Sequence, residues 1–449
     1  MKLIITDINH QGEGVGRLAG KVYFVPGALP GEEVEIEVTE EKKSWARARI
    51  INLHVPSAER CQPHCPYFEQ CGGCQLQQLA YSAQLAVKRE LVQNTLKRIG
   101  KLDLGKVEVR SVLGMVEPWQ YRNKVVWHVT KVNRRLRLGF FQRGGQQIIP
   151  IDYCLLLPLR LNQLKNKIEH LLNEINILPY DWRNHTGQLR HIILRQTVTG
   201  QVMVGLVTVP EVSLKRRLME LASKLLGEEG VTTVVWNINQ QKTREILGRE
   251  NQTLAGPGFI EEEILGLKFQ VSLAAFLQVN PRQTEVLYQQ AAGAAALSGG
   301  EKVIDAYCGV GSIALLMARQ AAEVRGVEVV AEAIAAARVN ATINRITNAS
   351  FRVGLAEKIL PEWEREGYRA QVIVVDPPRA GVELPALQAM AGMKPERIVY
   401  VACDVATLAR DLARLQELGY EPKWVQPVDM FPHTQHIECV VSLKRKHSP

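Results

Sequence analysis

The sequence predicts an α/β protein with a C-terminal open parallel sheet, preceded by a small β-barrel and a mixed α+β central region. Three observations support this prediction. Short strand-like runs separated by turn residues fill residues 1–56, basic and aromatic residues interleave within residues 57–275, and apolar strands alternate with helical segments in residues 276–449. We expect these three ranges to be the domains of the chain.

The first 56 residues alternate strands with turns. Strands are expected at 2–8, 20–25, 33–39 and 44–52, whereas the glycines of 12–16 and the Pro-Gly composition of 26–31 are typical of turns. The pattern predicts a small antiparallel barrel. Such barrels bind nucleic acid or serve as structural modules. Four basic residues of this region favour nucleic acid slightly: Lys42, Lys43, Arg47 and Arg49.

Five of the eight cysteines lie in two places. Cys61, Cys65, Cys71 and Cys74 are clustered, and Cys154 stands alone. Clustered thiols in a protein without secretion signals point to a metal rather than to disulfides. Zinc held by the four clustered cysteines and a [4Fe–4S] cluster held by three of them with a distant fourth both remain open, as do buried cysteines without a ligand.

The central region contains two stretches in which cations and rings interleave, 119–124 and 134–143. They predict a hairpin with a cationic face whose rings stack on exposed bases, although a solvated face over an aromatic core has the same pattern. A second hairpin is expected from 189–196 and 201–209, and Arg190 and Arg195 would contribute to a cationic face in the same way. Helices are expected at 158–175, 213–226 and 281–297.

The stretch 303–312 carries the strongest functional signal. An apolar strand containing Asp305 runs into a turn with Tyr307, Gly309 and Gly311, and a helix-prone run follows. Strand, turn and helix form a ligand site beyond the carboxyl end of a parallel strand. Few glycines and an acidic residue suit S-adenosylmethionine better than NAD, because it has no pyrophosphate. About twenty residues on, Glu328 ends a second strand, where a carboxylate commonly binds ribose hydroxyls.

Three later residues are expected on the same rim of the sheet. Asp376 follows a buried strand and precedes two prolines, and Cys403 ends the strand 397–402. The runs 423–430 and 437–443 flank a short loop and should pair as an antiparallel hairpin. If the first is parallel to the sheet, the second enters at the carboxyl edge, which brings Glu438 to the rim.

Composition limits the partners. The formal net charge is +9 with a pI near 9.1, which favours a polyanion such as nucleic acid. No apolar run approaches the roughly 20 residues of a membrane span. The N-terminus lacks the pattern of a signal peptide, so we expect a cytoplasmic protein without a membrane partner.

With these motifs in this order, the chain resembles the RNA uridine-5-methyltransferase family over nearly its whole length. Residues 12–17 and 25–31 are similar to a TRAM module, and 121–124 and 139–143 to the RNA-facing central domain of the family. The C-terminal motifs match a Rossmann-like S-adenosylmethionine methyltransferase domain, and they lie at 276–280, 305–311, 376–379, 400–403 and 433–438.

The resemblance implies a role for each motif residue. The methyl donor S-adenosyl-L-methionine would be held by Gln278, Tyr307, Glu328 and Asp376. Cys403 would be the nucleophile and Glu438 the base. A [4Fe–4S] cluster would be held by Cys65, Cys71, Cys74 and Cys154. Two positions depart from the family pattern: Asp404-Val405 follow the cysteine in place of Asn-Pro, and Leu355 stands where Asp is typical.

The chemistry explains these residue types. Carbon 5 of uracil is a poor nucleophile, so a thiolate must add to carbon 6 before carbon 5 takes a methyl group, and a carboxylate must then remove the carbon-5 proton. The resemblance also implies the substrate. The barrel and the clustered cysteines accompany the ribosomal branch of the family, so we expect a monomeric methyltransferase that acts on uridine in 23S ribosomal RNA. The alternatives are a tRNA T-loop methyltransferase and a non-catalytic RNA-binding iron–sulfur protein.

Overall fold

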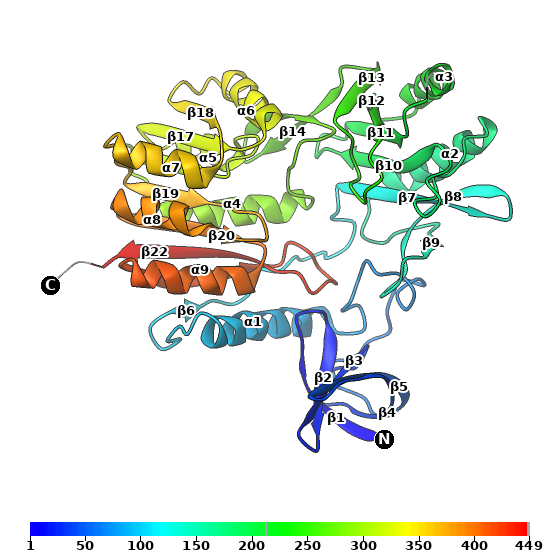
Figure 1. Ribbon diagram of the computed structural model, residues 1–449, viewed down its shortest axis with the longest axis horizontal. Coiled ribbons are helices and arrows are strands. Elements are labelled where there is room, and N and C mark those ends of the chain that lie inside the picture. The colour runs from blue at the N-terminus through cyan, green and yellow to red at the C-terminus, as the bar shows by residue number, and fades with distance from the viewer. Residues whose placement is uncertain (212, 447–449) are drawn as a thin grey trace. The chain divides into compact units, whose positions relative to one another are not determined.

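The computed structural model describes residues 1–211 and 213–446 (Figure 1). They form two compact units. Unit 1 comprises Met1–Pro118, Gln289–Ala295 and the chain from Glu364 onward, and unit 2 comprises Trp119–Tyr288 and Ala296–Trp363. Among the helices of the described residues, none is both long and apolar enough to cross a bilayer.

Unit 1 begins with the predicted barrel, which is closed by five strands in the order β1-β2-β3-β5-β4, and the pairing of β3 with β5 is parallel rather than antiparallel. Its strands are β1 (Lys2–Ile8), β2 (Glu13–Leu18), β3 (Lys21–Pro26), β4 (Glu33–Glu41) and β5 (Trp45–Val55). Strand β2 occupies a stretch predicted as a turn. Its glycines serve close packing, because a Cβ at Gly14 would lie 2.7 Å from the carbonyl oxygen of Ala28, and one at Gly16 2.7 Å from that of Ile4.

The rest of unit 1 is an α/β layer with strands in the order β19-β20-β22-β21-β6. The strands are β19 (Val372–Val375), β20 (Arg397–Ala402), β22 (Glu438–Arg445), β21 (Tyr420–Val428) and β6 (Glu108–Val109). The helices are α1 (Tyr81–Arg98), α8 (Leu384–Gly392) and α9 (Val405–Glu417), and α1 lies beside α9 (Figure 1). The predicted hairpin of β21 and β22 is confirmed, with β22 paired antiparallel to both β20 and β21.

Unit 2 contains three parallel strands in the order β18-β17-β16, with helices between them. They are β16 (Lys302–Ala306), β17 (Glu323–Glu328), β18 (Ala349–Val353), α5 (Ser312–Ala318), α6 (Ala331–Ile343) and α7 (Ala356–Arg365). Helix α4 (Pro281–Ala295) precedes them. The βαβ pattern confirms the predicted α/β class.

A seven-stranded sheet makes up most of the remainder of unit 2, in the order β13-β12-β11-β10-β7-β8-β9. Its strands are β13 (Glu250–Ala255), β12 (Val231–Ile238), β11 (Val202–Thr208), β10 (Leu189–Gln196), β7 (Lys124–Val132), β8 (Arg135–Phe141) and β9 (Ile148–Pro150). The other elements are helices α2 (Leu159–Glu174) and α3 (Leu214–Leu226) and the hairpin of β14 (Phe259–Ile264) with β15 (Leu267–Ser272).

Two arginines of β10 do not form the predicted cationic face. Arg190 and Arg195 are buried, at 6% and 2% exposure. Arg190 donates hydrogen bonds to the backbone carbonyls of three residues between 239 and 243, and Arg195 donates to those of Ala275 and Leu277 at 3.0 Å. That part of the prediction is wrong, because alternation along a strand does not distinguish a solvated arginine from one that binds buried carbonyls.

Candidate active site

Cys403, Glu438 and Asp376 lie at one edge of the unit 1 sheet. In the pairing of β20 with β22, Ala402 is opposite Cys439, so Cys403 leaves one strand where Glu438 begins the other. In the parallel pairing of β19 with β20, Val375 is opposite Tyr400, which places Asp376 just beyond the same edge. The register therefore brings together the thiol and two carboxyl groups that were expected on this rim.

The Cys403 thiol is half-buried and electrostatically disfavoured as an anion. Burial, together with the charges of Glu438 and Asp376, raises its pKa to about 12, although Arg379 opposes this shift. The thiol is therefore protonated in the free protein at neutral pH. A reaction that uses the thiolate must first move this proton away.

Glu438 is the most deeply buried acidic group of this edge, at 2% exposure. Burial raises its pKa well above the ordinary range, Asp376 adds to this effect, and Arg379 opposes it. Its Oε2 atom has no hydrogen-bond partner within the described residues. A buried carboxylate with a raised pKa and an unused oxygen is suited to accept a proton from a ligand. Burial also raises the pKa of Asp376, to about 6.

The residue after the thiol has a structural role of its own. Asp404 is the N-cap of α9, and its carboxylate accepts a hydrogen bond of 2.8 Å from the backbone N–H of Thr407. The departure from Asn-Pro thus places a good capping residue directly after Cys403. The helix it begins fixes the chain on that side of the thiol.

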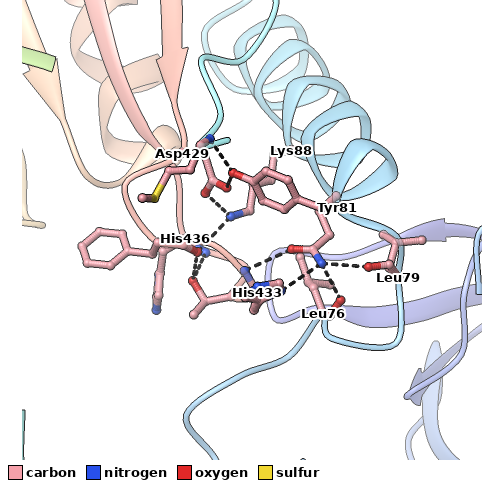
Figure 2. Close-up of polar contacts among 11 residues, drawn as sticks. Leu76, Leu79, Tyr81, Lys88, Asp429, His433 and His436 are labelled. Carbon is pink, nitrogen blue, oxygen red and sulfur yellow. Dashed lines mark hydrogen bonds and ion pairs between the residues drawn. The ribbon is translucent and has the colours of Figure 1, made fainter. Parts of the chain in front are cut away.

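The loop between β21 and β22, residues 429–437, is held by a buried ion pair (Figure 2). Lys88 of α1 contacts Asp429 at 2.5 Å, with side chains 1% and 0% exposed. Lys88 also donates to the carbonyl oxygen of Phe431 at 3.1 Å, and the Tyr81 hydroxyl donates to Asp429 at 2.8 Å. Because the loop ends at Glu438, α1 fixes the chain that carries the candidate base.

His433 closes the same loop from the other side. It adopts a left-handed backbone conformation with φ of 66°. Its carbonyl oxygen accepts from the N–H groups of Gln75 and Leu76, both at 3.0 Å, and its own N–H donates to the Gln84 side chain at 3.0 Å. Burial lowers the pKa of the His433 ring to about 3, with Lys88 contributing. His433 therefore shapes the loop as a neutral residue.

We expect Lys88→Met to destabilise the protein by roughly 3–5 kcal/mol, because it leaves the Asp429 carboxylate buried without its cation. Chemical denaturation measures the change. Lys97→Met, at an exposed position of the same helix, is the matched control and should change stability by less than about 0.5 kcal/mol. The double variant Lys88→Met/Asp429→Asn should recover part of the loss. A loss below about 1 kcal/mol in Lys88→Met would contradict this account.

In unit 2, the turn after β16 has the form expected of a ligand loop. Tyr307, Gly309 and Gly311 have left-handed φ values of 71°, 53° and 86°. A Cβ at Gly309 would meet open space within 4 Å. The Glu328 carboxylate, at the end of β17, accepts hydrogen bonds from the N–H groups of Gly309 at 3.3 Å and Val330 at 3.0 Å. These residues fit a nucleoside whose ribose hydroxyls meet Glu328.

Gln278 lies in the segment between β15 and α4, and its side chain is 6% exposed. Arg195 binds the carbonyls of Ala275 and Leu277 on one side of it, and the backbone N–H of Asn123 donates to Val279 at 2.8 Å on the other. Buried hydrogen bonds thus fix the backbone that carries Gln278.

The cysteines are thiols and form no disulfide in the described chain. Cys65, Cys71 and Cys74 lie in unit 1 and Cys154 in unit 2. Among the residues that the structure describes, no three His, Cys, Asp or Glu side chains are grouped so as to hold a metal ion. The arrangement of the thiols therefore gives no support to the predicted [4Fe–4S] cluster.

Sequence reasoning missed two kinds of functional residue. Arg379 was given no role of its own, although its charge lowers the pKa of both Cys403 and Glu438. Its place directly after the Asp-Pro-Pro motif was the available signal. Lys88 lies four residues from Gln84 and from Val92, on the buried stripe of α1, and this spacing was the available signal.

Comparisons with known proteins agree with this geometry. The family model described as tRNA (uracil-5-)-methyltransferase matches residues 80–446, and the TRAM domain model matches residues 1–51. Two relatives bear the name uncharacterized RNA methyltransferase. The relative from Listeria innocua is 46% identical, and the match covers 99% of this chain and 98% of the relative. The relative from Halalkalibacterium halodurans is 44% identical, and the match covers 100% of this chain and 97% of the relative.

A solved structure is similar along the whole chain. It is the crystal structure of Pyrococcus abyssi tRNA (uracil-54, C5)-methyltransferase in complex with S-adenosyl-L-homocysteine. The TM-score is 0.76 at 27% identity, with coverage of 99% of this chain and 100% of that one. The predicted methyltransferase fold with an N-terminal TRAM barrel is confirmed.

Proposed function

Because the chain belongs to the tRNA (uracil-5-)-methyltransferase family, and is an S-adenosylmethionine-dependent RNA uracil-5-methyltransferase, we propose that it methylates 23S ribosomal RNA through a covalent adduct on Cys403. One observation carries the mechanism: Cys403 and Glu438 meet at the edge where β20 and β22 pair. A thiol and a buried carboxyl group at facing positions of two neighbouring strands suit attack on one pyrimidine ring and removal of a proton from it.

The proposed reaction assigns one step to each group. The Cys403 thiol gives up its proton to solvent, and its sulfur forms a bond to carbon 6 of the uracil. The electrons of the carbon 5–carbon 6 double bond move toward the carbon-4 carbonyl as an enolate, which makes carbon 5 nucleophilic. S-adenosylmethionine supplies the electrophilic methyl group that carbon 5 takes. The Glu438 carboxylate then removes the carbon-5 proton, and the electrons of that bond restore the double bond as sulfur leaves carbon 6. The target base must leave the RNA stack to reach both groups.

Binding of the methyl donor is assigned to Gln278, Tyr307, Glu328 and Asp376. The left-handed turn at Tyr307 and the carboxylate of Glu328 beside it support this assignment, as does the buried, hydrogen-bonded backbone around Gln278. Asp376, at the rim of the unit 1 sheet, rests on its motif alone.

The RNA class is tested by methyl transfer from labelled S-adenosylmethionine. We expect label on unmodified 23S ribosomal RNA and none on unmodified transfer RNA. The Pyrococcus neighbour is named for a tRNA substrate and favours the second candidate, a tRNA methyltransferase. Label on tRNA alone would refute the ribosomal proposal. Label on neither RNA would mean that the substrate is another RNA.

A [4Fe–4S] cluster on Cys65, Cys71, Cys74 and Cys154 stays a proposal that rests on spacing and family resemblance. Protein purified without oxygen should contain iron and sulfide and absorb visible light, and Cys71→Ser should lose all three signals. Cys439→Ser, which changes a buried thiol outside the set, should retain them. Zinc in place of iron, or iron unaffected by Cys71→Ser, would contradict the proposal.

A further inference from the structure

The loop after β19, residues 376–382, carries Arg379, a charged neighbour of Cys403. A backbone hydrogen bond of 2.8 Å from the N–H of Gly381 to the carbonyl oxygen of Pro378 closes a turn in this loop. Arg379 is the second residue of the turn. Its side chain is exposed, and it lines the same pocket of unit 1 as Cys403. The place of this charge therefore depends on how the turn is held.

A buried carboxylate on α9 holds the end of the turn. Asp411 is 0% exposed. Its Oδ2 atom accepts hydrogen bonds from the backbone N–H of Val382 at 2.8 Å and from the Tyr400 hydroxyl at 2.7 Å. Hydrogen bonds to an ionised acceptor are stronger than neutral ones, and burial strengthens them further. Because Tyr400 lies on β20, Asp411 ties the turn to the strand that leads to Cys403.

Arg410 ties the middle of the turn to the same carboxylate. Its Nε atom donates to Oδ1 of Asp411 at 2.8 Å, and its Nη2 atom donates to the carbonyl oxygen of Ala380 at 2.8 Å. The hydrogen bond to Asp411 raises the pKa of Arg410. Arg414, on the next turn of the helix, adds a second positive charge 3.6 Å from Oδ1. Both oxygens of Asp411 are thus used, which offsets the free energy cost of burying its charge.

Gly381 shows that the turn and α9 fit one another closely. Its φ is 80°, a left-handed conformation that favours glycine. A Cβ at this position would clash with the Asp411 carboxylate and with the Arg410 guanidinium. The turn reaches these two groups only because glycine stands here.

The charges around the thiol show why the place of Arg379 matters. Burial, Glu438 of β22 and Asp376 of the loop after β19 raise the pKa of Cys403, and Arg379 opposes them. The same arginine opposes the effect of burial and Asp376 on the pKa of Glu438. In the described part of the chain, no hydrogen bond or ion pair is found for the Arg379 side chain, so only the backbone of the turn fixes it. Release of the turn would leave the negative charges at the thiol less opposed.

We propose that Asp411 is a positioning residue, which holds the turn 378–381 against α9 and thereby keeps Arg379 beside Cys403. It acts through Val382 and Arg410 and not on the reacting atoms. The proposal rests on the proposed function for the role of Cys403. Because α9 begins at Val405, directly after the N-cap that follows the thiol, one helix fixes both the thiol and the arginine that acts on its charge.

Alkylation of Cys403 by iodoacetamide, followed by mass spectrometry of the peptide that contains it, tests the proposal in the full chain without RNA. At about pH 8, well below the pKa of the thiol, the rate is proportional to the thiolate fraction. Arg379→Gln should slow alkylation roughly two- to fivefold, the usual size of a charge interaction at an exposed position. Asp411→Asn should slow it by at least about twofold, because the amide no longer holds Arg410 and the turn is released.

The direction of the change distinguishes positioning from a merely structural role. Loss of the Asp411 charge by itself favours the thiolate, and a loosened sheet edge exposes the thiol, so both of these effects accelerate alkylation. Only displacement of Arg379 slows it. The double variant Arg379→Gln/Asp411→Asn should therefore react like Arg379→Gln alone. Glu417→Gln removes a negative charge from an exposed position of the same helix and, as the matched control, should react like the wild type.

Three results would overturn the proposal: alkylation of Asp411→Asn at or above the wild-type rate, no effect of Arg379→Gln, or a double variant slowed by the product of the two single effects. If Asp411→Asn fails to fold, Gly381→Ala displaces the turn while leaving Asp411 in place, and it should slow alkylation in the same way. Methyl transfer that persists in Cys403→Ala would refute the proposed mechanism and leave these alkylation rates unaffected.

Discussion

Replacement of Cys403 by alanine is expected to abolish methyl transfer, with a loss of at least roughly a thousandfold in rate. Without the sulfur no bond forms to carbon 6, and carbon 5 stays too weak a nucleophile to take a methyl group. The measurement is transfer of labelled methyl to the RNA substrate. Cys403→Ser should be nearly as inactive, because a hydroxyl is a far weaker nucleophile than a thiolate at neutral pH.

We expect Cys403→Ala to fold like the wild type, since Cys403 is half-buried at a strand end. A melting temperature close to that of the wild type is the control. Activity of Cys403→Ala within about tenfold of the wild type would remove the cysteine from the mechanism.

The pH dependence of the thiol gives an independent test of the same residue. Burial, with Glu438 and Asp376, raises the pKa of Cys403 to about 12, so the thiolate fraction of the free protein increases with pH up to that value. Alkylation of Cys403 by iodoacetamide should therefore accelerate continuously from neutral pH into the alkaline range. A rate that levels off near neutral pH would show a thiol already ionised there.

The rim of the sheet was predictable because strand direction and register leave few choices. Once 423–430 and 437–443 were assigned as a hairpin whose first strand is parallel to the sheet, the positions of Cys403 and Glu438 at the same edge followed. The structure adds what register cannot supply: the burial of Glu438, and Arg379 as the cation that lowers the pKa of the thiol.

The sequence analysis was wrong where the role of a residue depends on its surroundings in the fold and not on its type. Gly14 and Gly16 suggested a turn, although they lie in β2 because neighbouring backbone leaves no space for a Cβ. Arg195 suggested an RNA contact, although it binds buried carbonyls. Both depend on contacts with distant segments, which a single sequence does not reveal. The same holds for the ion pair of Lys88 and Asp429, which are 341 residues apart.

Glu438→Gln is expected to stop turnover and leave the RNA attached to Cys403. The glutamine has the size of the buried glutamate but cannot accept the carbon-5 proton, so the methylated adduct cannot eliminate the sulfur. Turnover should fall by roughly a hundredfold to ten-thousandfold. A protein–RNA species that survives denaturing electrophoresis and carries labelled methyl is the measurement.

The electrostatics of the site also predict how the substitution changes the rate of adduct formation. The Glu438 charge raises the pKa of Cys403, so its removal favours the thiolate, and the adduct should form at least as fast in Glu438→Gln as in the wild type. The double variant Cys403→Ala/Glu438→Gln should form no adduct, and Glu417→Gln, at an exposed position of α9, should turn over normally. Turnover of Glu438→Gln near the wild-type rate would assign the proton removal to another group. Loss of turnover without an adduct would mean that Glu438 acts before the sulfur–carbon bond forms.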